Sequence, residues 1–256
     1  MSSHAAPNSS RVAVFAPPYD RFQPQPLIPI GNVTEWRGQA LVWTVRDAAS
    51  QMREVDWLAR RPFGLPLIVL LPHPDDIADA VPLLRYIRDL RPRAIVPGAV
   101  LGAPEHVRNL LAAPPRNLAD SVTQYLIDRG MLRDEIARRE VHRLLELSGE
   151  LCSISQLARR MYTSRRTLGR HFGASRLPVP SHWLQFGRLL HVAMHLHNER
   201  TAVFRIAARA RYPDGFTLSN QMKRLIGYRP SEVRRLLGWE WLVEAWLLKE
   251  MLVHNS

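Results

Sequence analysis

The sequence contains very little cysteine and lacks a long apolar run. Its single cysteine, Cys152, has no second cysteine for an internal disulfide, and one thiolate does not indicate a thiolate metal cage. No apolar run reaches the length of about 18 residues that indicates a membrane-spanning helix. The first ten residues show no basic-then-apolar secretion signal. We therefore expect a cytoplasmic protein that makes no use of a membrane.

Lysine is also scarce, yet the protein is strongly basic. The chain has 256 residues, enough for one or two domains, and 46% of them are apolar, which is a globular balance. Basic residues outnumber acidic ones 35 to 23, for a net charge of +12, and all of these cations except Lys223 and Lys249 are arginines. Such an excess indicates a polyanionic partner, most often nucleic acid, although an arginine-rich surface can also be merely solvated.

The positive charge is concentrated in the second half of the chain. Residues 151–238 hold 16 basic side chains against three acids, whereas residues 1–132 are close to neutral. Proline has the opposite bias, with 16 of its 20 residues before position 132. The basic window is typical of an electrostatic footprint for nucleic acid, and the change in composition predicts a domain boundary near Gly130.

Residues 33–132 are predicted to form a small α/β domain after a proline-rich, partly flexible arm at 1–32, which holds one candidate strand, Val12–Ala16. Apolar runs bounded by glycine or proline alternate with helix-like stretches, and this order favours a parallel-type sheet. The predicted strands are Leu41–Val45, Leu65–Leu71 and Ala94–Pro97, and the predicted helices are 47–60, 75–90, 104–113 and one from Asn117 to Gly130.

The order of these elements resembles a shortened response-regulator receiver. Phosphoryl transfer in a receiver requires an acceptor aspartate, an acidic pair for Mg²⁺ and a lysine, and the first half of this chain contains no lysine. We therefore expect a receiver-like domain without phosphotransfer residues, which serves as a scaffold, a dimeriser or a ligand sensor.

A short string after the second predicted strand leaves an enzymatic alternative open. His73-Pro74-Asp75-Asp76 resembles the metal-binding signature of the zinc-dependent LmbE-like deacetylases, and imidazole and carboxylate are ordinary Zn²⁺ ligands. That family needs a further histidine-rich motif, and His106 is the only later histidine in this half. The preferred interpretation is that Asp75 or Asp76 caps a helix, so we expect no metal, no cofactor and no catalysis.

The second half contains a pair of short predicted helices with a tight break, Tyr162-Thr163, between them. Ser153 is predicted to cap the first helix, and Ser164 is predicted to cap the second, Arg165 to Phe172. Leu168 and Phe172 form the inward stripe of the second helix, which leaves its outer face basic. Two short helices with a turn between them, the second outwardly basic, form a helix-turn-helix.

The arrangement recurs further along the chain. Thr201 is predicted to cap a helix that runs through Ala210, and Asp214 is predicted to cap the next, with Leu218 and Met222 inward. A long predicted helix, Pro180 to Asn198, joins the two pairs. A rigid helix of this kind holds two recognition helices at a fixed separation. Because consecutive major-groove faces lie about 34 Å apart, one chain can read two adjacent turns of DNA.

Residues 134–236 resemble the DNA-binding domain of the AraC/XylS transcription regulators. The likeness rests on Ser164 to Phe172, Ile206-Ala207, Tyr212 to Phe216 and Lys223 to Arg234. Four positions depart from the residues usual in the family, namely Arg211, which replaces a glycine, Leu218, Met222 and Asn220. The resemblance implies an all-α double helix-turn-helix domain at 133–238 that binds promoter DNA and carries out no chemical step.

The resemblance also implies that the outward residues of each second helix contact DNA. Arginine forms paired hydrogen bonds with guanine, and asparagine or glutamine does the same with adenine, whereas any cation can hold a phosphate. Both roles stay open for each arginine of the first recognition helix, where the threonine can touch a thymine methyl. On the second, the amides are candidate base readers and the cations are assigned to phosphates. The candidate DNA-binding residues are Arg165, Arg166, Thr167, Arg170, Thr217, Asn220, Gln221, Lys223 and Arg224.

Two further features are assigned to surface or packing roles. His191, His195 and His197 of the linking helix are expected to be plain surface or DNA-proximal residues and not to bind a metal. No acid is apparent that would orient His142 or His171 beside a serine nucleophile. A tryptophan-rich amphipathic helix at residues 239–256 is expected to pack on its own chain or on a partner subunit.

The sequence as a whole predicts a mixed fold and a regulator of transcription. An α/β domain precedes an all-α domain that binds double-stranded DNA in a sequence-specific way, and the first domain gives the protein a means to form a homodimer or to sense an unknown effector. Two rival functions remain, a zinc-dependent hydrolase that uses His73, Asp75 and Asp76, and a nonspecific architectural DNA binder.

Overall fold

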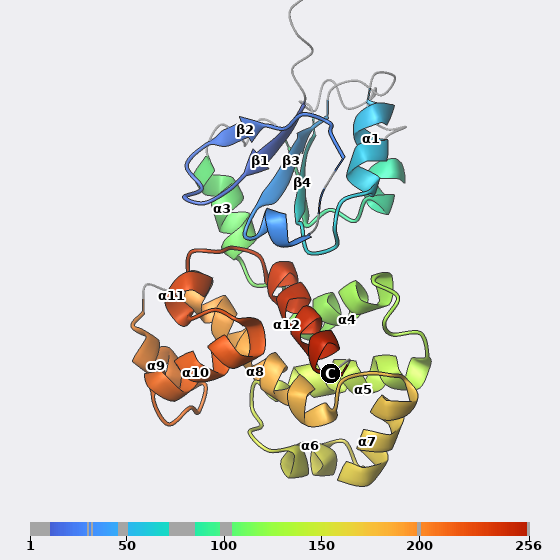
Figure 1. Ribbon diagram of the computed structural model, residues 1–256, viewed down its shortest axis with the longest axis vertical. Coiled ribbons are helices and arrows are strands. Elements are labelled where there is room, and N and C mark those ends of the chain that lie inside the picture. Colours follow the sequence, from blue (N-terminus) through green and yellow to red (C-terminus); the bar gives the residue numbers. More distant parts are fainter. Residues whose placement is uncertain are drawn as a thin grey trace, which may run out of the picture. The chain divides into compact units, whose positions relative to one another are not determined.

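The computed structural model describes residues 11–29, 31, 33–45, 51–71, 85–97, 104–198 and 201–254, and the chain forms two compact units. The first unit comprises Met1–Leu111 with Arg235–Trp241, and the second comprises Ala112–Arg234 with Leu242–Ser256. The first contains a sheet with helices, and the second is helical in its described residues (Figure 1). The mixed fold class predicted from the sequence is therefore confirmed.

A mixed five-stranded sheet forms the centre of the first unit. Its strands are β1 (Val12–Phe15), β2 (Phe22–Pro24), β3 (Ala40–Thr44), β4 (Leu67–Leu71) and β5 (Ala94–Pro97). They lie in the order β2-β1-β3-β4-β5. The strands β3, β4 and β5 pair in parallel, as the alternation of strands and helices predicts.

The other two strands pair antiparallel, so the sheet as a whole is not of the parallel type. β1 pairs antiparallel with both β2 and β3. These two strands come from residues that the sequence places in a partly flexible arm, but Val12 and Phe15 are fully buried. The apolar residues of β1 thus have a place in the core, and this burial orders a segment whose proline content alone favours an arm.

The helices of this unit cover the sheet and close its core. They include η1 (Val33–Trp36), α1 (Met52–Ala59) and α3 (Pro104–Ala112), which ends at the first residue of the second unit. Residues 85–89 are also helical, and Ile87 and Leu90 enter the core. Trp57 and Leu58 of α1 enter one core cluster with Trp43 of β3 and Leu67 of β4. The residues between β4 and position 85, and those between β5 and α3, lie outside the described residues.

A segment from the far end of the chain, Arg235–Trp241, completes the first unit. The hydroxyl of Tyr19 donates a hydrogen bond to the carbonyl of Gly38 and accepts one from the N–H of Leu237 at 2.9 Å. Burial raises the pKa of Tyr19 to about 12, so the hydroxyl keeps its proton at neutral pH and can serve as the donor. This side chain therefore ties the returning segment to the turn after β1.

The second unit is formed by helices throughout its described residues. They are α4 (Leu118–Asp128), α5 (Glu135–Ser148), α6 (Ile154–Arg160), α7 (Arg165–Ala174), α8 (Pro180–Asn198), α9 (Val203–Arg209), α10 (Gly215–Ile226), α11 (Pro230–Val233) and α12 (Trp239–His254), of which the last begins in the first unit. No helix among the described residues is both long and apolar enough to span a membrane.

The units divide between Leu111 and Ala112, earlier in the chain than the composition change near Gly130. Asn117 caps α4 as predicted, with its side chain accepting from two N–H groups, but α4 packs against α5 within the second unit. The predicted boundary marks a change in proline content and charge. Amino-acid composition does not show which neighbouring helix α4 packs against.

The terminal helix is buried on several sides, which differs from the amphipathic helix that the sequence predicts. Leu242, Val243 and Glu244 are consecutive and all buried. The carboxylate of Glu244 accepts hydrogen bonds from the hydroxyl of Tyr125 in α4 and from the Nε of Arg129, the residue after α4, both at 2.8 Å. The hydrogen bond to Glu244 raises the pKa of Arg129. A buried carboxylate that is paired and hydrogen-bonded in this way can occupy a buried face of the helix.

The replacement Tyr19→Phe is expected to lower the free energy of unfolding by about 1–3 kcal/mol, because the buried carbonyl and N–H groups lose their partner. Urea denaturation followed by tryptophan fluorescence measures the change. The matched control is Tyr86→Phe, at a tyrosine whose ring is exposed, and it should change stability by less than about 0.5 kcal/mol. Equal stability of the two variants would show that the hydroxyl does not anchor the returning segment.

Candidate nucleic-acid interface

The first helix pair, α6 and α7, has the caps that the sequence predicts, and the predicted inward residues of α7, Leu168 and Phe172, are buried. Ser153 Oγ accepts a hydrogen bond from the Gln156 N–H at 3.3 Å, and Ser164 Oγ accepts one from the Thr167 N–H at 3.0 Å. The fully or nearly fully buried residues are Leu157, Ala158, Leu168 and Phe172. Since the first N–H groups of a helix have no partner within it, the two serines fix where the helices begin.

The second pair, α9 and α10, has the same cap at the start of its second helix. Asp214 Oδ1 accepts a hydrogen bond from the Thr217 N–H at 2.6 Å. This bond is the main cause that lowers the pKa of Asp214, and the carboxylate stays charged at the positive end of the helix. Leu218 and Met222 are fully buried, as predicted.

The predicted cap at Thr201 is wrong. The capping position of α9 belongs to Ala202, and no side chain caps the helix. The carbonyl of Thr201 instead accepts a hydrogen bond from the guanidinium of Arg234. A threonine one residue before the cap looks the same in the sequence as a threonine at the cap, and the contact with Arg234, 33 residues away, has no signal in the local sequence.

The turns inside the two pairs have the same backbone conformation. Tyr162 and Arg211 both lie in the left-handed region, at φ 52° and 56°. That region favours glycine, and Arg211 stands where the resembled family usually has one. The matching hydrogen bonds run from the N–H groups of Tyr162 to Arg159 O at 3.1 Å, Thr163 to Ala158 O at 3.0 Å, Arg211 to Ala208 O at 3.1 Å and Tyr212 to Ala207 O at 2.9 Å.

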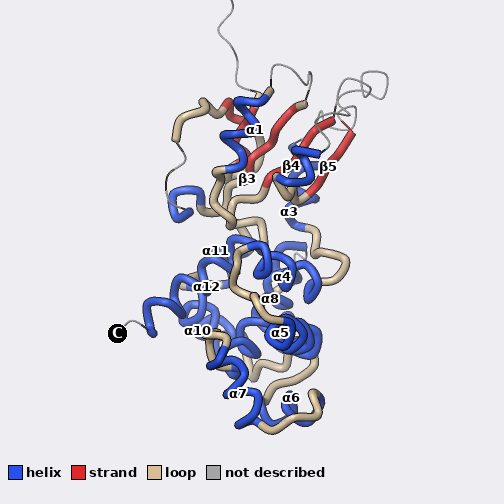
Figure 2. The backbone as a smooth tube through the Cα atoms, turned by 90° about the vertical axis from the view of Figure 1, so that its right-hand side faces the viewer, coloured by secondary structure: helices blue, strands red, loops and turns tan. Residues whose placement is uncertain are grey.

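The two recognition-helix candidates can therefore be aligned from their caps, Ser164 and Asp214. Each capping side chain bonds to the N–H three residues later, in both cases of a threonine. By this count Arg165, Arg166, Thr167 and Arg170 of α7 correspond to Gly215, Phe216, Thr217 and Asn220 of α10. In Figure 2 α7 and α10 lie to the left of α5, and α7 also contacts α5.

Most of the predicted DNA-binding residues are available to a partner. Their side chains are exposed, and none forms a hydrogen bond or ion pair with another described residue. These residues are Arg165, Arg166, Arg170, Asn220 and Lys223. A free guanidinium, amide or ammonium group on a helix surface can bond to a base edge or a phosphate without breaking an internal contact.

The two predicted threonines have their hydroxyls in the caps. The hydroxyl of Thr167 lies 2.8 Å from Ser164 Oγ, and the hydroxyl of Thr217 hydrogen-bonds with the Asp214 carboxylate. Both residues are half-buried. Only their methyl groups are left for a contact with DNA, so the structure gives them mainly a role in positioning the helices.

Two other predicted residues are joined to the linking helix. The Oε1 of Gln185 on α8 accepts hydrogen bonds from Arg224 Nη2 and, at 3.4 Å, from Gln221 Nε2. In addition, Lys249 Nζ donates to the carbonyls of Lys223 and Arg224 at 3.2 and 3.1 Å. The contribution of Gln185 and Lys249 has no signal in the sequence, because neither lies near the second pair along the chain.

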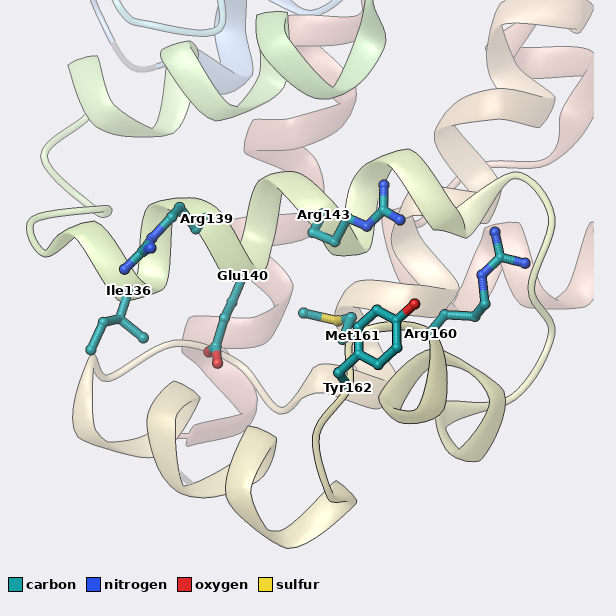
Figure 3. Close-up of a pocket in the computed structure, with 7 residues that line it drawn as sticks. All are labelled: Ile136, Arg139, Glu140, Arg143, Arg160, Met161 and Tyr162. Atoms are coloured by element: carbon teal, nitrogen blue, oxygen red, sulfur yellow. The ribbon is translucent and has the colours of Figure 1, made fainter.

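A basic hollow of about 310 Å³ extends the charged surface beyond α7. Arg139 and Arg143 of α5 and Arg160 of α6 line it, together with the exposed ring of Tyr162 (Figure 3). Arg143 is paired with Glu146 at 2.9 Å and Arg160 lies 3.9 Å from Glu150. These exposed pairs are weak, so the same cations can also face a polyanion.

Several histidines are paired with acids, which the sequence did not predict. His142 Nε2 lies 2.6 Å from Asp120 Oδ1, and His171 Nδ1 lies 2.6 Å from Glu140 Oε1. The expectation that no acid orients these rings is therefore wrong. No serine hydroxyl among the described residues bonds to either ring, so the pairs do not extend to a nucleophile.

The histidines of the linking helix are not all surface residues. His191 is half-buried, and burial lowers its pKa, while a ring nitrogen of His197 lies 3.1 Å from the Val233 carbonyl oxygen. Of the three, only His195 is exposed. Within the described ranges no three His, Cys, Asp or Glu residues are grouped to hold a metal ion. The proposed zinc ligands His73, Asp75 and Asp76 lie outside these ranges.

Comparison with known proteins neither supports nor contradicts the resemblance seen in the sequence. No family model matches the chain, and no curated protein matches it. The resemblance to the AraC/XylS regulators therefore rests only on the sequence of residues 134–236.

Removal of a cap in the first pair is expected to destabilise the helical unit. Ser164→Ala should cost about 1 kcal/mol of unfolding free energy, the usual value for a lost N-cap. Thr201→Ala is the matched control, because the Thr201 side chain caps no helix, and it should change stability by less than about 0.5 kcal/mol. Chemical denaturation followed by circular dichroism at 222 nm compares them. A larger loss in the Thr201 variant would contradict the assigned caps.

Replacement of the left-handed residue in the first turn is expected to stabilise the helical unit. Tyr162 is 97% exposed and has φ 52°, so Tyr162→Gly removes strain and almost no packing. We expect a gain of roughly 0.5 kcal/mol, since the left-handed cost of about 1–2 kcal/mol exceeds the entropy cost of glycine. Arg211→Gly should gain less, because Arg211 Nη1 donates to the Glu150 carbonyl at 3.0 Å. Thermal unfolding measures both variants, and a loss at position 162 would contradict the argument.

Proposed function

We propose that the protein is a sequence-specific regulator of transcription that binds double-stranded DNA through α7 and α10. The observation that carries the proposal is the repetition of one local structure. Each pair has a left-handed turn, a capped second helix and a face of exposed residues at the start of that helix. A helix that enters the major groove contacts base edges with residues near its N-terminus, which is where these exposed residues lie.

The charge of the helical unit supports the proposal. The window that contains both pairs holds 16 basic residues and three acids. Affinity for DNA depends strongly on cations that neutralise phosphates and release counterions. Positive charge alone also fits a nonspecific binder, and it is the presence of exposed arginines and an asparagine on the helix faces that favours base reading.

The linking helix supports the proposal by giving the pairs a common support. Eleven of the nineteen residues of α8 are buried, and α8 contacts α6 and α7 of the first pair and α9 of the second. Two recognition helices attached to one buried helix keep their separation, and DNA with a fixed repeat of about 34 Å requires this.

The compartment, the partner and the role of the first unit are part of the same proposal. A regulator of this kind acts in the cytoplasm, on duplex DNA, without a chemical step of its own. The α/β unit would then serve to dimerise the protein or to sense an effector.

The test is selection of binding sites from random duplexes by the full chain, followed by affinity measurements at several salt concentrations. Lys223→Ala should weaken binding to selected and random duplexes alike and reduce the slope of log K against log salt by about 1. Asn220→Ala should cost about 1–3 kcal/mol on the selected duplex and little on random DNA.

The matched control is Arg88→Ala in the first unit, whose side chain is 83% exposed, and it should leave both affinities unchanged. Equal affinity of the wild-type chain for selected and random duplexes would indicate an architectural binder. Absence of binding to any duplex at low salt would refute the proposal.

A further inference from the structure

The second position of α10 carries an exposed aromatic ring. Phe216 is 75% exposed, although it lies among polar and basic residues. The neighbouring inward residues Leu218 and Met222 are fully buried, so the ring is not required to fill the core of the pair. Phe204 at the start of α9 is also 62% exposed, and its backbone lies against Gly215, so two large apolar side chains are left in water near the start of α10. A group of exposed apolar side chains marks a contact with a partner.

The caps show that this ring occupies an equivalent position to Arg166 on α7. Each residue stands two positions after the capping side chain, Ser164 in one pair and Asp214 in the other. One turn further on, Arg170 of α7 corresponds to Asn220 of α10. The same two surface positions therefore carry two guanidinium groups on one helix and a phenyl ring with an amide on the other.

The two arginines of α7 and the phenylalanine and asparagine of α10 match different bases. Guanidinium groups bond to O6 and N7 of guanine, whereas an amide bonds to N6 and N7 of adenine. An apolar side chain contacts the C5-methyl group of thymine, which projects into the major groove. The start of α7 thus has the chemistry for guanine, and the start of α10 has the chemistry for thymine and adenine.

The surroundings of the ring favour DNA over an apolar protein partner. Lys223 and Arg224 follow on the same helix, and Arg205 on α9 stacks its guanidinium 5.8 Å from the ring centre of Phe204. Gly215 lies against the backbone of Phe204, because a Cβ at position 215 would be 3.5 Å from the Phe204 Cα. The starts of α9 and α10 are therefore adjacent, and the cations Arg205, Lys223 and Arg224 lie on the two helices that meet there.

We propose that Phe216 is a specificity-determining residue that contacts a thymine methyl group in the major groove. The binding site is then asymmetric, with a guanine-containing half for α7 and an A·T-containing half for α10. This inference rests on the proposed DNA-binding function, and it adds which base each half of the site contains.

The test uses the full chain and duplexes obtained by selection. Each thymine of the selected site is replaced in turn by deoxyuridine, which removes only the methyl group. At one position the wild-type affinity should fall by about fourfold, which corresponds to the ~0.8 kcal/mol of one buried methyl-sized group. Phe216→Ala should abolish that difference at the same position. Phe63→Ala, at an exposed ring of the first unit, is the matched control and should keep it.

A second variant and a second base analogue keep the test independent of folding. Phe216→Arg gives α10 the residue that α7 has at the equivalent position, and selection with this variant should return guanine in place of that thymine. Replacement of guanine by 7-deazaguanine in the other half should weaken the wild type and Phe216→Ala alike, because α7 is unchanged. Circular dichroism verifies that each variant is folded.

The outcomes separate this inference from the function on which it rests. If the chain selects a site but no single deoxyuridine lowers its affinity, or if Phe216→Ala keeps the same sensitivity, the role of Phe216 is wrong and sequence-specific binding stands. If the chain selects no site at all, the proposed function itself is wrong.

Discussion

The stacking of aromatic side chains between α8 and α12 holds the helical unit together. Trp246 lies flat against Phe186, with ring centres 4.2 Å apart, and meets Trp183 edge-on at 4.5 Å. Aromatic pairs of this kind contribute about 0.5–1.5 kcal/mol each beyond their burial. Gly187 lets α8 pack closely against α5, since a Cβ at position 187 would lie only 2.5 Å from the Oγ of Ser148 in α5. The linking helix is thus fixed by α5 and α12.

Because α8 is fixed, it holds the two helix pairs in position relative to each other. Gln185 of α8 bonds to Gln221 and Arg224 of α10, and Arg188 Nη2 donates to the Ala210 carbonyl at 2.9 Å in the turn of the second pair. These contacts explain how the two helix pairs can share one backbone arrangement although their exposed side chains differ. The caps and turns set the position of each helix, and the faces at their starts are then free to differ in chemistry.

Much of this arrangement could be predicted from local sequence. The caps at Asn117, Ser153, Ser164 and Asp214 depend on a side chain and an N–H group within three residues, and all four are present. The linking helix has the predicted ends, Pro180 and Asn198. The parallel strands β3, β4 and β5 follow from apolar runs between glycine and proline.

What could not be predicted depends on partners that are distant in sequence. The burial of α12 needs Phe186 and Trp183, the pairs of His142 and His171 need acids on other helices, and the start of α9 lies next to an Arg234 contact. Periodicity shows that a helix has an apolar face, but it does not show how many neighbours surround it. The prediction of an amphipathic terminal helix failed for this reason.

The central claim is that α7 and α10 enter the major groove together, held by α8. A hydroxyl-radical footprint of the full chain on a selected duplex tests it most directly, because the reagent reports backbone protection at single-nucleotide resolution. Two protected patches are expected on one face of the duplex, separated by about 10 base pairs. A single patch, or even protection along the whole duplex, would contradict it.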